Sequence, residues 1–345
     1  MFFVRPANAS DFDNIERMVR SDGPPLHSLP PDPERLAKWL QDSSRSISAN
    51  VSSPGDECYC FVLEDATTGK LHGVASIAAT ARHRAPFYAF REEALVHASR
   101  ELNVNHRVSA LTISHDLTQH SRLTGCYFGE MVREQPAVAQ LLSSARLMFA
   151  ALYRERFAEE VFTMLPGLVD ENGRMPFWDG VGYKFFGCDV GQLEVKSSGR
   201  GRTFIPEMLP VDPLYVGLLS DEAQRAIGQI HSSAEAAYRC HLDEGLLNSN
   251  FIDIFDAGPV LTAPFKRCHS VREGLMRKAV RGSVGAAEQE YLLSNTSAQG
   301  FRCTAIRLPA DLPPEVALPG PVADLLGVDE GDSVRFVPVP NGRKA

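Results

Sequence analysis

The chain has 345 residues, with 23% charged and 44% hydrophobic side chains and a formal net charge of -8. This length exceeds that of a usual single-core domain, so we expect two domains or one domain with a substantial extension. No apolar run of about 18 residues is present to span a membrane. The first residues lack a secretory signal, and the negative charge disfavours nonspecific binding to nucleic acid. We expect a soluble, cytoplasmic protein whose partners are small molecules.

Cysteine usage indicates neither a disulfide framework nor a metal site. The seven cysteines are an odd number, and no C-x-x-C pair occurs among them. Zinc sites need several clustered ligands, which the surroundings of the closely spaced Cys58 and Cys60 do not supply. We expect free thiols, no metal and no permanently bound cofactor.

The start of the chain predicts a strand followed by two helices. Phe2–Ala7 is typical of a strand, and Ser10-Asp11 offers an N-cap before apolar residues that recur at helical spacing from Phe12 to Val19. The stretch Ser21–Pro33 is dense in Pro, Gly and Asp, which predicts a loop, and a second helix is expected to start at Pro33.

A hairpin and a long helix are predicted next. Tyr59–Glu64 and Leu71–Ile77 are β-rich and are joined by a turn that contains Asp and Gly. Apolar residues at helical spacing predict a helix over Ala137–Phe157. The other expected elements are strands at Val108–Ser114, Gly125–Phe128 and Val161–Val169, and a helix-to-strand segment at Trp178–Phe186.

The Gly, Ser and Arg-rich stretch Lys196–Arg202 predicts a domain boundary. We therefore expect one domain over residues 1–195 and a second over residues 203–345. The second is expected to contain a helix at Asp221–His241, a strand at Phe251–Phe255, and a β-rich end with strands at Cys303–Leu308 and Val334–Val339.

Several motifs, in order along the chain, resemble those of one known family. Two of them are Ala226-Ile227-Gly228-Gln229-Ile230-His231 and the segment Asn250–Pro259. The resemblance is to the arginine (ornithine) N-succinyltransferases, and to the alpha-type chain that accompanies a beta-type chain in some organisms. It covers nearly the whole chain, and its other landmarks are Val4–Ala7, Phe61–Asp65, Leu95–Val104, Pro176–Trp178 and Phe204–Pro210.

The resemblance implies a fold and a reaction. The fold class is α/β (α+β), a GCN5-related N-acyltransferase-like fold whose strands splay apart to admit coenzyme A, with a C-terminal extension domain ending in β-rich structure. The reaction moves succinyl from succinyl-CoA to the α-amino group of L-arginine in arginine catabolism, with ornithine as a second candidate acceptor. Succinyl-CoA is then a co-substrate, and a homo-oligomer or a hetero-oligomer with a beta-type chain is expected.

The resemblance also implies a catalytic histidine. Amide formation from a thioester needs a proton for the departing thiolate, and histidine suits this task because its ordinary pKa is about 6.5. Gly228-Gln229-Ile230-His231 matches the family's Gly-Gln-x-His motif, which makes His231 the proton-donating residue. The alternative is a helix histidine bonded to a backbone carbonyl. His97 and His115 likewise have both a functional and a structural interpretation.

Coenzyme binding is assigned by the same resemblance. The strand Gly125–Phe128 corresponds to the strand whose main chain contacts the pantetheine arm, and the family's succinyl-CoA-contacting position carries over to Cys126. A backbone contact tolerates many side chains, so Cys126 need not be a nucleophile, and its side chain is expected to be a small buried apolar group.

One segment departs from the pattern of this fold, which usually cradles the pyrophosphate with a glycine-containing loop at a helix start. Val132–Gln140 has no glycine: Ala137 and Val138 carry Cβ atoms there, and Glu134 repels phosphate, although Arg133 can supply charge. The alternative function is therefore a noncatalytic or regulatory alpha subunit with weakened coenzyme binding. A generic acetyltransferase is a weaker third hypothesis, because the resemblance extends beyond the common core.

Substrate recognition needs a cation for the succinyl carboxylate and anions for the guanidinium or the amine. The residues alone do not rank the candidates, except that Asp253 and Asp256 belong to the apolar segment of the predicted strand Phe251–Phe255. A charge in an apolar segment is costly to bury, which favours a function for these two residues. The candidate cations are Arg91, Arg122 and Arg146, and the candidate anions are Asp253, Asp256 and Glu207.

Overall fold

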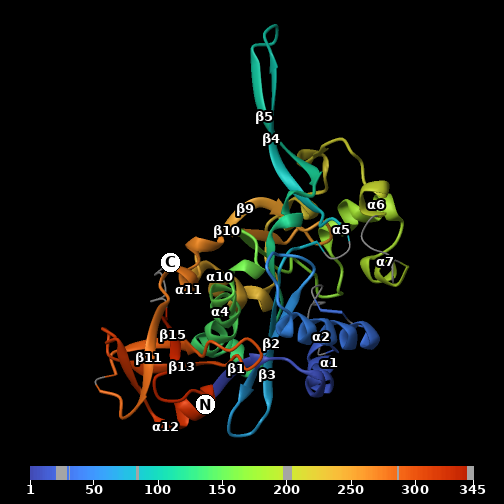
Figure 1. Ribbon diagram of the computed structural model, residues 1–345. Helices are drawn as coiled ribbons and strands as arrows, with labels where there is room; N and C mark the ends of the chain where they lie inside the picture. The colour runs from blue at the N-terminus through green and yellow to red at the C-terminus, as the bar shows by residue number, and fades with distance from the viewer. Residues whose placement is uncertain (21–28, 31, 83–84, 197–203, 286, 340–345) are drawn as a thin grey trace.

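The computed structural model describes the chain except for residues 21–28, 31, 83–84, 197–203, 286 and 340–345 (Figure 1). It is a mixed α/β protein built on a 15-stranded sheet with the order β14-β11-β15-β12-β13-β1-β2-β3-β6-β7-β10-β9-β4-β5-β8. Of the described strand pairs, β6 with β7 and β11 with β14 are parallel, and the rest are antiparallel. The expected α/β class is confirmed at this level.

The N-terminal segment forms the predicted strand, two helices and hairpin. The first helical turn is capped by Asn8 rather than by Ser10-Asp11, because the Asn8 side chain accepts from the Ser10 N–H while the Asp11 carboxylate accepts from the Asn8 N–H. The predicted loop at Ser21–Pro33 falls largely on residues outside the described part. The elements are β1 (Phe2–Pro6), η1 (Ala9–Asp11), α1 (Phe12–Arg20), α2 (Pro33–Ser48), β2 (Cys58–Asp65) and β3 (Leu71–Ala78).

The central strands are buried on both faces. Along β2, Phe61 and Leu63 point into the core cluster that includes α4, whereas Cys60 and Val62 point into the cluster formed with α1 and α2. This alternation follows from the two-residue period of a strand. Figure 1 shows α4 and α10 on one side of these strands and α1 and α2 on the other.

A long hairpin and the strands that form the site follow. β4 was not predicted, because its charged residues Arg91, Glu92 and Glu93 interrupt the apolar pattern; it forms a ribbon with β5 that projects from the body (Figure 1). The elements are β4 (Ala89–Ser99), β5 (Val104–Ser114), η2 (Asp116–Gln119), β6 (Ser121–Phe128), α3 (Glu130–Arg133), α4 (Pro136–Leu152), η3 (Arg154–Arg156) and β7 (Glu160–Met164).

Two predictions fail in the next segment. Trp178–Phe186 contains no strand: it lies in two short helices, and the buried Trp178 ring donates from Nε1 to the Cys188 carbonyl. The predicted helix Asp221–His241 is interrupted after Ala226, where Gly228 has a φ of +70° that a helix does not allow. The elements are α5 (Pro176–Gly180), α6 (Gly182–Phe186), α7 (Val190–Lys196), α8 (Ile205–Met208), β8 (Leu214–Tyr215), η5 (Val216–Leu218), α9 (Asp221–Ala226), η6 (Ser232–Ala234) and α10 (Glu235–Asp243).

The β-rich C-terminal end is confirmed, and its β13 pairs with β1. Upstream of it, β9 and β10 pair with β4 and β7. The division into residues 1–195 and 203–345 stays a prediction, since nearly all of the proposed boundary lies outside the described residues. The elements are β9 (Leu247–Ile252), β10 (Pro259–Pro264), η7 (Phe265–Arg267), α11 (His269–Arg272), β11 (Leu275–Arg281), β12 (Gln289–Ser294), β13 (Cys303–Leu308), β14 (Glu315–Leu318), α12 (Gly320–Leu326) and β15 (Ser333–Pro338).

Candidate active site

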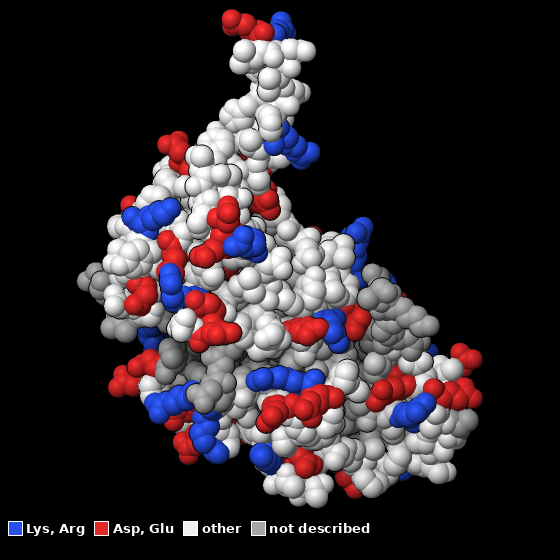
Figure 2. Space-filling view, turned by 180° about the vertical axis from the view of Figure 1, so that it is seen from behind, with Lys and Arg blue, Asp and Glu red and all other residues white. Residues whose placement is uncertain are grey.

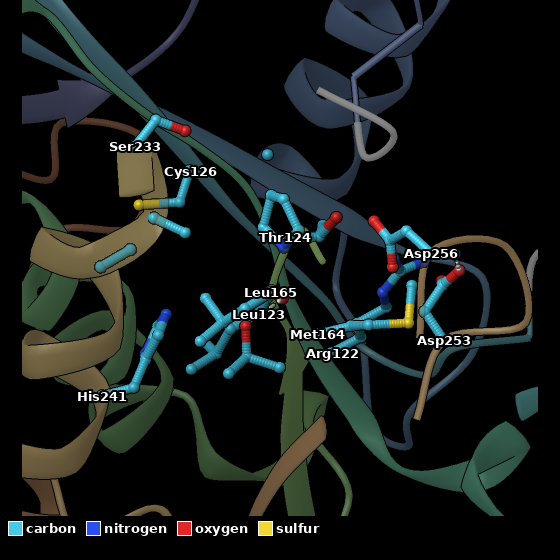
Figure 3. A pocket seen from close by; sticks show the side chains of 15 residues that line it. Arg122, Leu123, Thr124, Cys126, Met164, Leu165, Ser233, His241, Asp253 and Asp256 are labelled. Atoms are coloured by element: carbon cyan, nitrogen blue, oxygen red, sulfur yellow. Dashed lines mark hydrogen bonds between the residues drawn. The ribbon is translucent and has the colours of Figure 1, made fainter. Parts of the chain in front are cut away.

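The candidate site is a pocket at the point where two neighbouring parallel strands separate. β6 and β7 pair through Leu123 and Thr163 and do not pair beyond them. The pocket occupies the gap that follows, between the later residues of β6 and the end of β7 (Figure 3). The lining residues are Arg122, Leu123, Thr124, Gly125, Cys126, Thr163, Met164, Leu165, Pro166, Ser233, Ala234, Ala237, His241, Asp253 and Asp256.

A bend in β6 accompanies this separation. The register between β3 and β6 shifts between Val74 and Ser76, and Gly125 opposite the shift has a φ of +59°. A β-bulge turns a strand locally, and glycine accepts the left-handed conformation without strain. A Cβ at Gly125 would also lie 3.1 Å from Ser76 Oγ, so the position is both bent and closely packed.

One wall of the pocket comes from the start of α10 and the turn before it. Ala234, Ala237 and His241 follow one another at spacings of three and four residues, which places them on one face of the helical segment. The two alanines leave space between the helix and the strands. His241, one turn beyond Ala237, is 1% exposed.

His231 lies directly beside the pocket. Its backbone N–H donates to the Pro166 carbonyl at 2.9 Å, and its Nδ1 lies 2.9 Å from Ser233 Oγ; Pro166 and Ser233 both line the pocket. Because Ser233 engages Nδ1, Nε2 is the ring nitrogen left for proton transfer. Burial lowers the pKa of His231 below its usual 6.5.

Two aspartates form the opposite end of the pocket, together with Arg122 (Figure 3). The predicted strand Phe251–Phe255 is wrong here: β9 ends at Ile252, and the two aspartates lie in the turn that follows it. Asp253 Oδ1 accepts from the Phe255 N–H at 2.5 Å, and the Asp256 carboxylate accepts from the N–H groups of Gly167 and Gly258 at 2.8 Å. These backbone donors stabilise two buried carboxylates.

Glycines at 167 and 258 allow the segments around the pocket to meet. A Cβ at Gly258 would lie 2.0 Å from the Leu165 carbonyl oxygen, and one at Gly167 would lie 2.3 Å from the Asp256 carbonyl oxygen. Both obstacles are backbone atoms, which cannot rotate away. The pocket edge that carries Pro166 and Asp256 therefore depends on two residues without side chains.

The two expected coenzyme-binding residues lie in different places. Cys126 lines the pocket, and burial raises the pKa of its thiol, so the sulfur stays protonated near neutral pH. Arg133 is exposed at the end of α3, where its Nε donates to the Phe128 carbonyl at 2.8 Å. Arg133 thus lies near the start of α4 and outside the set of pocket-lining residues.

The remaining predicted charges lie outside the pocket lining. Arg146 is fully buried in α4 and donates to the Ser76 and Ser143 carbonyl oxygens. Arg91 pairs with Glu93 and Asp116 near the base of the β4–β5 ribbon. The other three are Glu207, exposed in α8; His97, exposed on β4 with its ring 5.7 Å from that of Tyr215; and His115, which precedes η2.

His241 was missed as a site residue by the sequence reasoning. Ala234, Ala237 and His241 share one helix face, but this spacing is equally typical of a helix face packed in a core, so it does not identify the site. Ser233 was missed as well, although it stands two residues after His231, just beyond the motif.

Neither a metal centre nor a membrane span is found within the described residues. No group of three or more His, Cys, Asp or Glu side chains there is arranged to hold a metal ion. No described helix combines the length and apolar character needed to cross a bilayer. All seven cysteines are free thiols.

Comparison with known proteins gives one consistent family. The family model described as "Arginine N-succinyltransferase beta subunit" matches residues 2–270, and the model of its C-terminal domain matches residues 277–338. "Arginine N-succinyltransferase subunit alpha" of Pseudomonas aeruginosa is 39% identical over 98% of this chain and 100% of that protein. "Arginine N-succinyltransferase" of Citrobacter koseri is 32% identical over 98% of this chain and 97% of that protein.

A solved structure agrees with the sequence comparisons. It is described as arginine/ornithine succinyltransferase subunit AI from Pseudomonas aeruginosa, and it superposes with a TM-score of 0.89 at 37% identity. The match covers 98% of this chain and 99% of that chain.

Proposed function

The chain belongs to the arginine N-succinyltransferase family, and on that premise we propose that it transfers succinyl from succinyl-CoA to the α-amino group of L-arginine, with ornithine as a second acceptor. The observation that carries the proposal is the pocket between β6 and β7 with His231 beside it. A thioester placed in that gap has a proton-transfer group at its edge.

We also propose that the fold is GCN5-related. Its support is the parallel β6–β7 pair that separates after Leu123 and Thr163, and the helix α4 that follows the first of these strands. Where two neighbouring strands separate they no longer pair with each other, so backbone N–H and C=O groups that face the gap can bind an amide-rich arm. Cys126 then contributes its main chain, while its protonated thiol only packs.

The reaction requires a balanced path for one proton. The neutral α-amine attacks the thioester carbonyl, the C–N bond forms, and the C–S bond breaks to release the coenzyme thiolate. His231 acts as a general acid that gives its Nε2 proton to the thiolate and takes up the proton that the amine loses, so the histidine ends as it began. The Ser233 backbone N–H donates to Nδ1 at 3.2 Å, so the neutral ring carries its proton on Nε2, which is the donor in this transfer.

Arg133 is proposed as a phosphate contact. Its exposed guanidinium lies just before α4, and the positive end of that helix's dipole favours an anion there. Glycine is absent there, and Ala137 is exposed on the first turn. Coenzyme phosphates are therefore expected to bind through charge more than through close backbone contact.

The second candidate function is a noncatalytic or regulatory subunit of a heteromeric succinyltransferase. The specific observation in its favour is the glycine-free start of α4, which leaves no close backbone cradle for the pyrophosphate. The "subunit alpha" in the relative's name is consistent with a companion chain. In either case we propose that the chain works as an oligomer.

One experiment separates the two functions. Thiol release from succinyl-CoA is measured for the purified chain alone, with arginine and then ornithine as acceptor, and again with a beta-type companion chain. Arginine-dependent release by the chain alone supports a self-sufficient enzyme. Release that appears only with the companion supports the subunit function and moves the search for coenzyme contacts to the other chain.

A further inference from the structure

We propose that His241, with the positive charge of Arg146 behind it, forms a carboxylate-binding subsite at the α10 end of the pocket. This inference rests on the proposed function, because it assigns a part of the same pocket to one chemical group of its substrates. The subsite determines which acyl donor or acceptor is accepted.

The first observation is a buried polar atom without a partner. His241 is 1% exposed, lines the pocket, and its Nδ1 has no hydrogen-bond partner among the described residues. Buried polar atoms in folded proteins are nearly always paired, so an exception in a cavity wall points to a group supplied by a ligand. Figure 3 shows the His241 side chain projecting from α10 among the residues that line the pocket.

The second observation is the space in front of the ring. Ala234 and Ala237 are the preceding residues on the same face, and both line the pocket. Their methyl groups leave the imidazole as the polar group at this end of the helical wall. A ligand that reaches past the strand backbones therefore meets His241 as the polar α10 side chain in the pocket lining.

The third observation is the sign of the local charge. Arg146 is fully buried, and within the described residues its guanidinium bonds to Ser143 and Ser76 without an ion pair to a carboxylate. Burial, with a further contribution from the Arg146 charge, lowers the pKa of His241 well below 6.5, so the ring is neutral at pH 7 and sits in a positive potential. The nearby Glu244 carboxylate is held by Ser144 and by the hydroxyl and N–H of Ser270.

The opposite end of the pocket has the other sign. Asp253 and Asp256 lie there with Arg122, so the carboxylates exceed the cations by one. An anionic group is repelled from that end and attracted toward Arg146. A neutral imidazole with one N–H donor in this potential suits a carboxylate better than a cation or a neutral carbonyl.

Two carboxylates are available in the proposed reaction: the terminal carboxylate of succinyl and the α-carboxylate of arginine. The test compares kcat/KM for succinyl-CoA with that for butyryl-CoA, which has a methyl group in place of the carboxylate, and for arginine with that for argininamide. His241→Leu removes the polar ring and His241→Gln keeps a donor. Cys240→Ala, a change at a buried α10 residue outside the pocket lining, controls for disturbance of the helix.

We expect His241→Leu to lower kcat/KM about tenfold or more for the substrate whose carboxylate binds there, and less than about threefold for its uncharged analogue. A larger loss for succinyl-CoA than for butyryl-CoA shows that His241 binds the succinyl carboxylate. A larger loss for arginine than for argininamide shows that it binds the α-carboxylate of arginine. His241→Gln should restore part of the loss. Equal losses for all substrates, or no loss, overturn the proposal.

A binding measurement keeps this result separate from the proposed function. Calorimetry of the His231→Ala variant, with and without the added His241→Leu change, measures binding without turnover. The ligands are succinyl-CoA, butyryl-CoA, arginine and argininamide. If the wild-type chain transfers no succinyl, the proposed function fails. A selective loss of succinyl-CoA or arginine affinity on His241→Leu still supports the subsite, and unchanged affinities for both overturn it.

Discussion

His231 is held by contacts that a helix histidine would not make. It ends the break between α9 and α10, with its N–H on the Pro166 carbonyl and its Nδ1 at Ser233. The alternative from the sequence, a helix histidine bonded to a backbone carbonyl, does not describe this geometry. We predict that His231→Ala lowers kcat by about 100-fold or more, as for the loss of a general acid or base. The far-ultraviolet circular dichroism should remain unchanged, and full turnover in a folded variant would remove His231 from the mechanism.

The pH dependence of the reaction tests which form of His231 is active. Its pKa is lowered by burial, so the neutral ring predominates at pH 7 and can take up the amine proton as it gives its own to the thiolate. As pH falls through this lowered pKa the ring becomes imidazolium, and kcat/KM should fall on the acid side, below about pH 6.5. The measurement is the ratio of wild-type to His231→Gln kcat/KM from pH 5 to 8. A ratio that instead falls with rising pH would indicate a histidine that must start protonated.

At the scale of elements, the turn after β9 and the segment after β7 fix the edge of the pocket. Gly258 packs against the Leu165 carbonyl, and a Cβ there would lie 2.0 Å from that oxygen. We predict that Gly258→Ala lowers the free energy of unfolding by about 1–3 kcal/mol, because backbone must shift to relieve the overlap. Gly217→Ala is the control, since its Cβ meets no atom within 4 Å; it should change stability by less than about 0.5 kcal/mol. Equal stability of both variants in urea unfolding would contradict this account.

The start of α4 gives a second prediction at this scale. Ala137 is exposed on the first turn, whereas Ala139 is 1% exposed in the core, so only the first can approach a phosphate. We expect Arg133→Gln to weaken succinyl-CoA binding about three- to tenfold by calorimetry, more at low salt than at high salt. Arg239→Gln, at an exposed arginine of α10, should leave the affinity unchanged. No effect at Arg133 would place the phosphates elsewhere.

The elements show which patterns in the sequence are informative. The helix α4 was predicted because apolar residues recur in it at helical spacing, and the strands β2 and β3 because they are β-rich runs joined by a turn. The predicted helix Asp221–His241 was wrong because Gly228 adopts a positive φ that breaks the helix, while the residues on both sides of it remain typical of a helix. The aspartates 253 and 256 were assigned to a strand because an apolar run does not show where pairing stops. His231 was found through its motif, while His241 depends on a contact between α10 and two strands that no local pattern records.

At the scale of the whole molecule, the sheet joins distant parts of the chain. β13 pairs with β1, and β9 and β10 lie between β7 and β4, so both sides of the site are tied together by strands from well-separated parts of the sequence. Figure 2 shows charges of both signs interspersed over one face of the body. The β4–β5 ribbon stands apart from this surface, and its outer part is exposed.

That ribbon carries the prediction about assembly. An isolated two-stranded hairpin is at best marginally stable in water, yet this one extends beyond the body and exposes Val96, Leu102 and Val104 by 64%, 73% and 45%. Its tip carries Arg100 and Glu101, so two copies related by a two-fold axis can match apolar residues and pair opposite charges. We therefore expect the ribbon to pack against a second copy of this chain.

Sedimentation velocity tests this assembly. The double change Val96→Asp and Leu102→Asp places charge where apolar contact is expected and should shift the protein to a monomer, with its circular dichroism retained. Met276→Asp is the matched control, because Met276 is also an exposed apolar residue but lies on β11 in the C-terminal part of the sheet. It should sediment like the wild type. A ribbon variant that sediments like the wild type would show that the outer ribbon is not the contact. If the wild-type chain forms a larger species only when a beta-type chain is added, the ribbon contacts that companion chain instead.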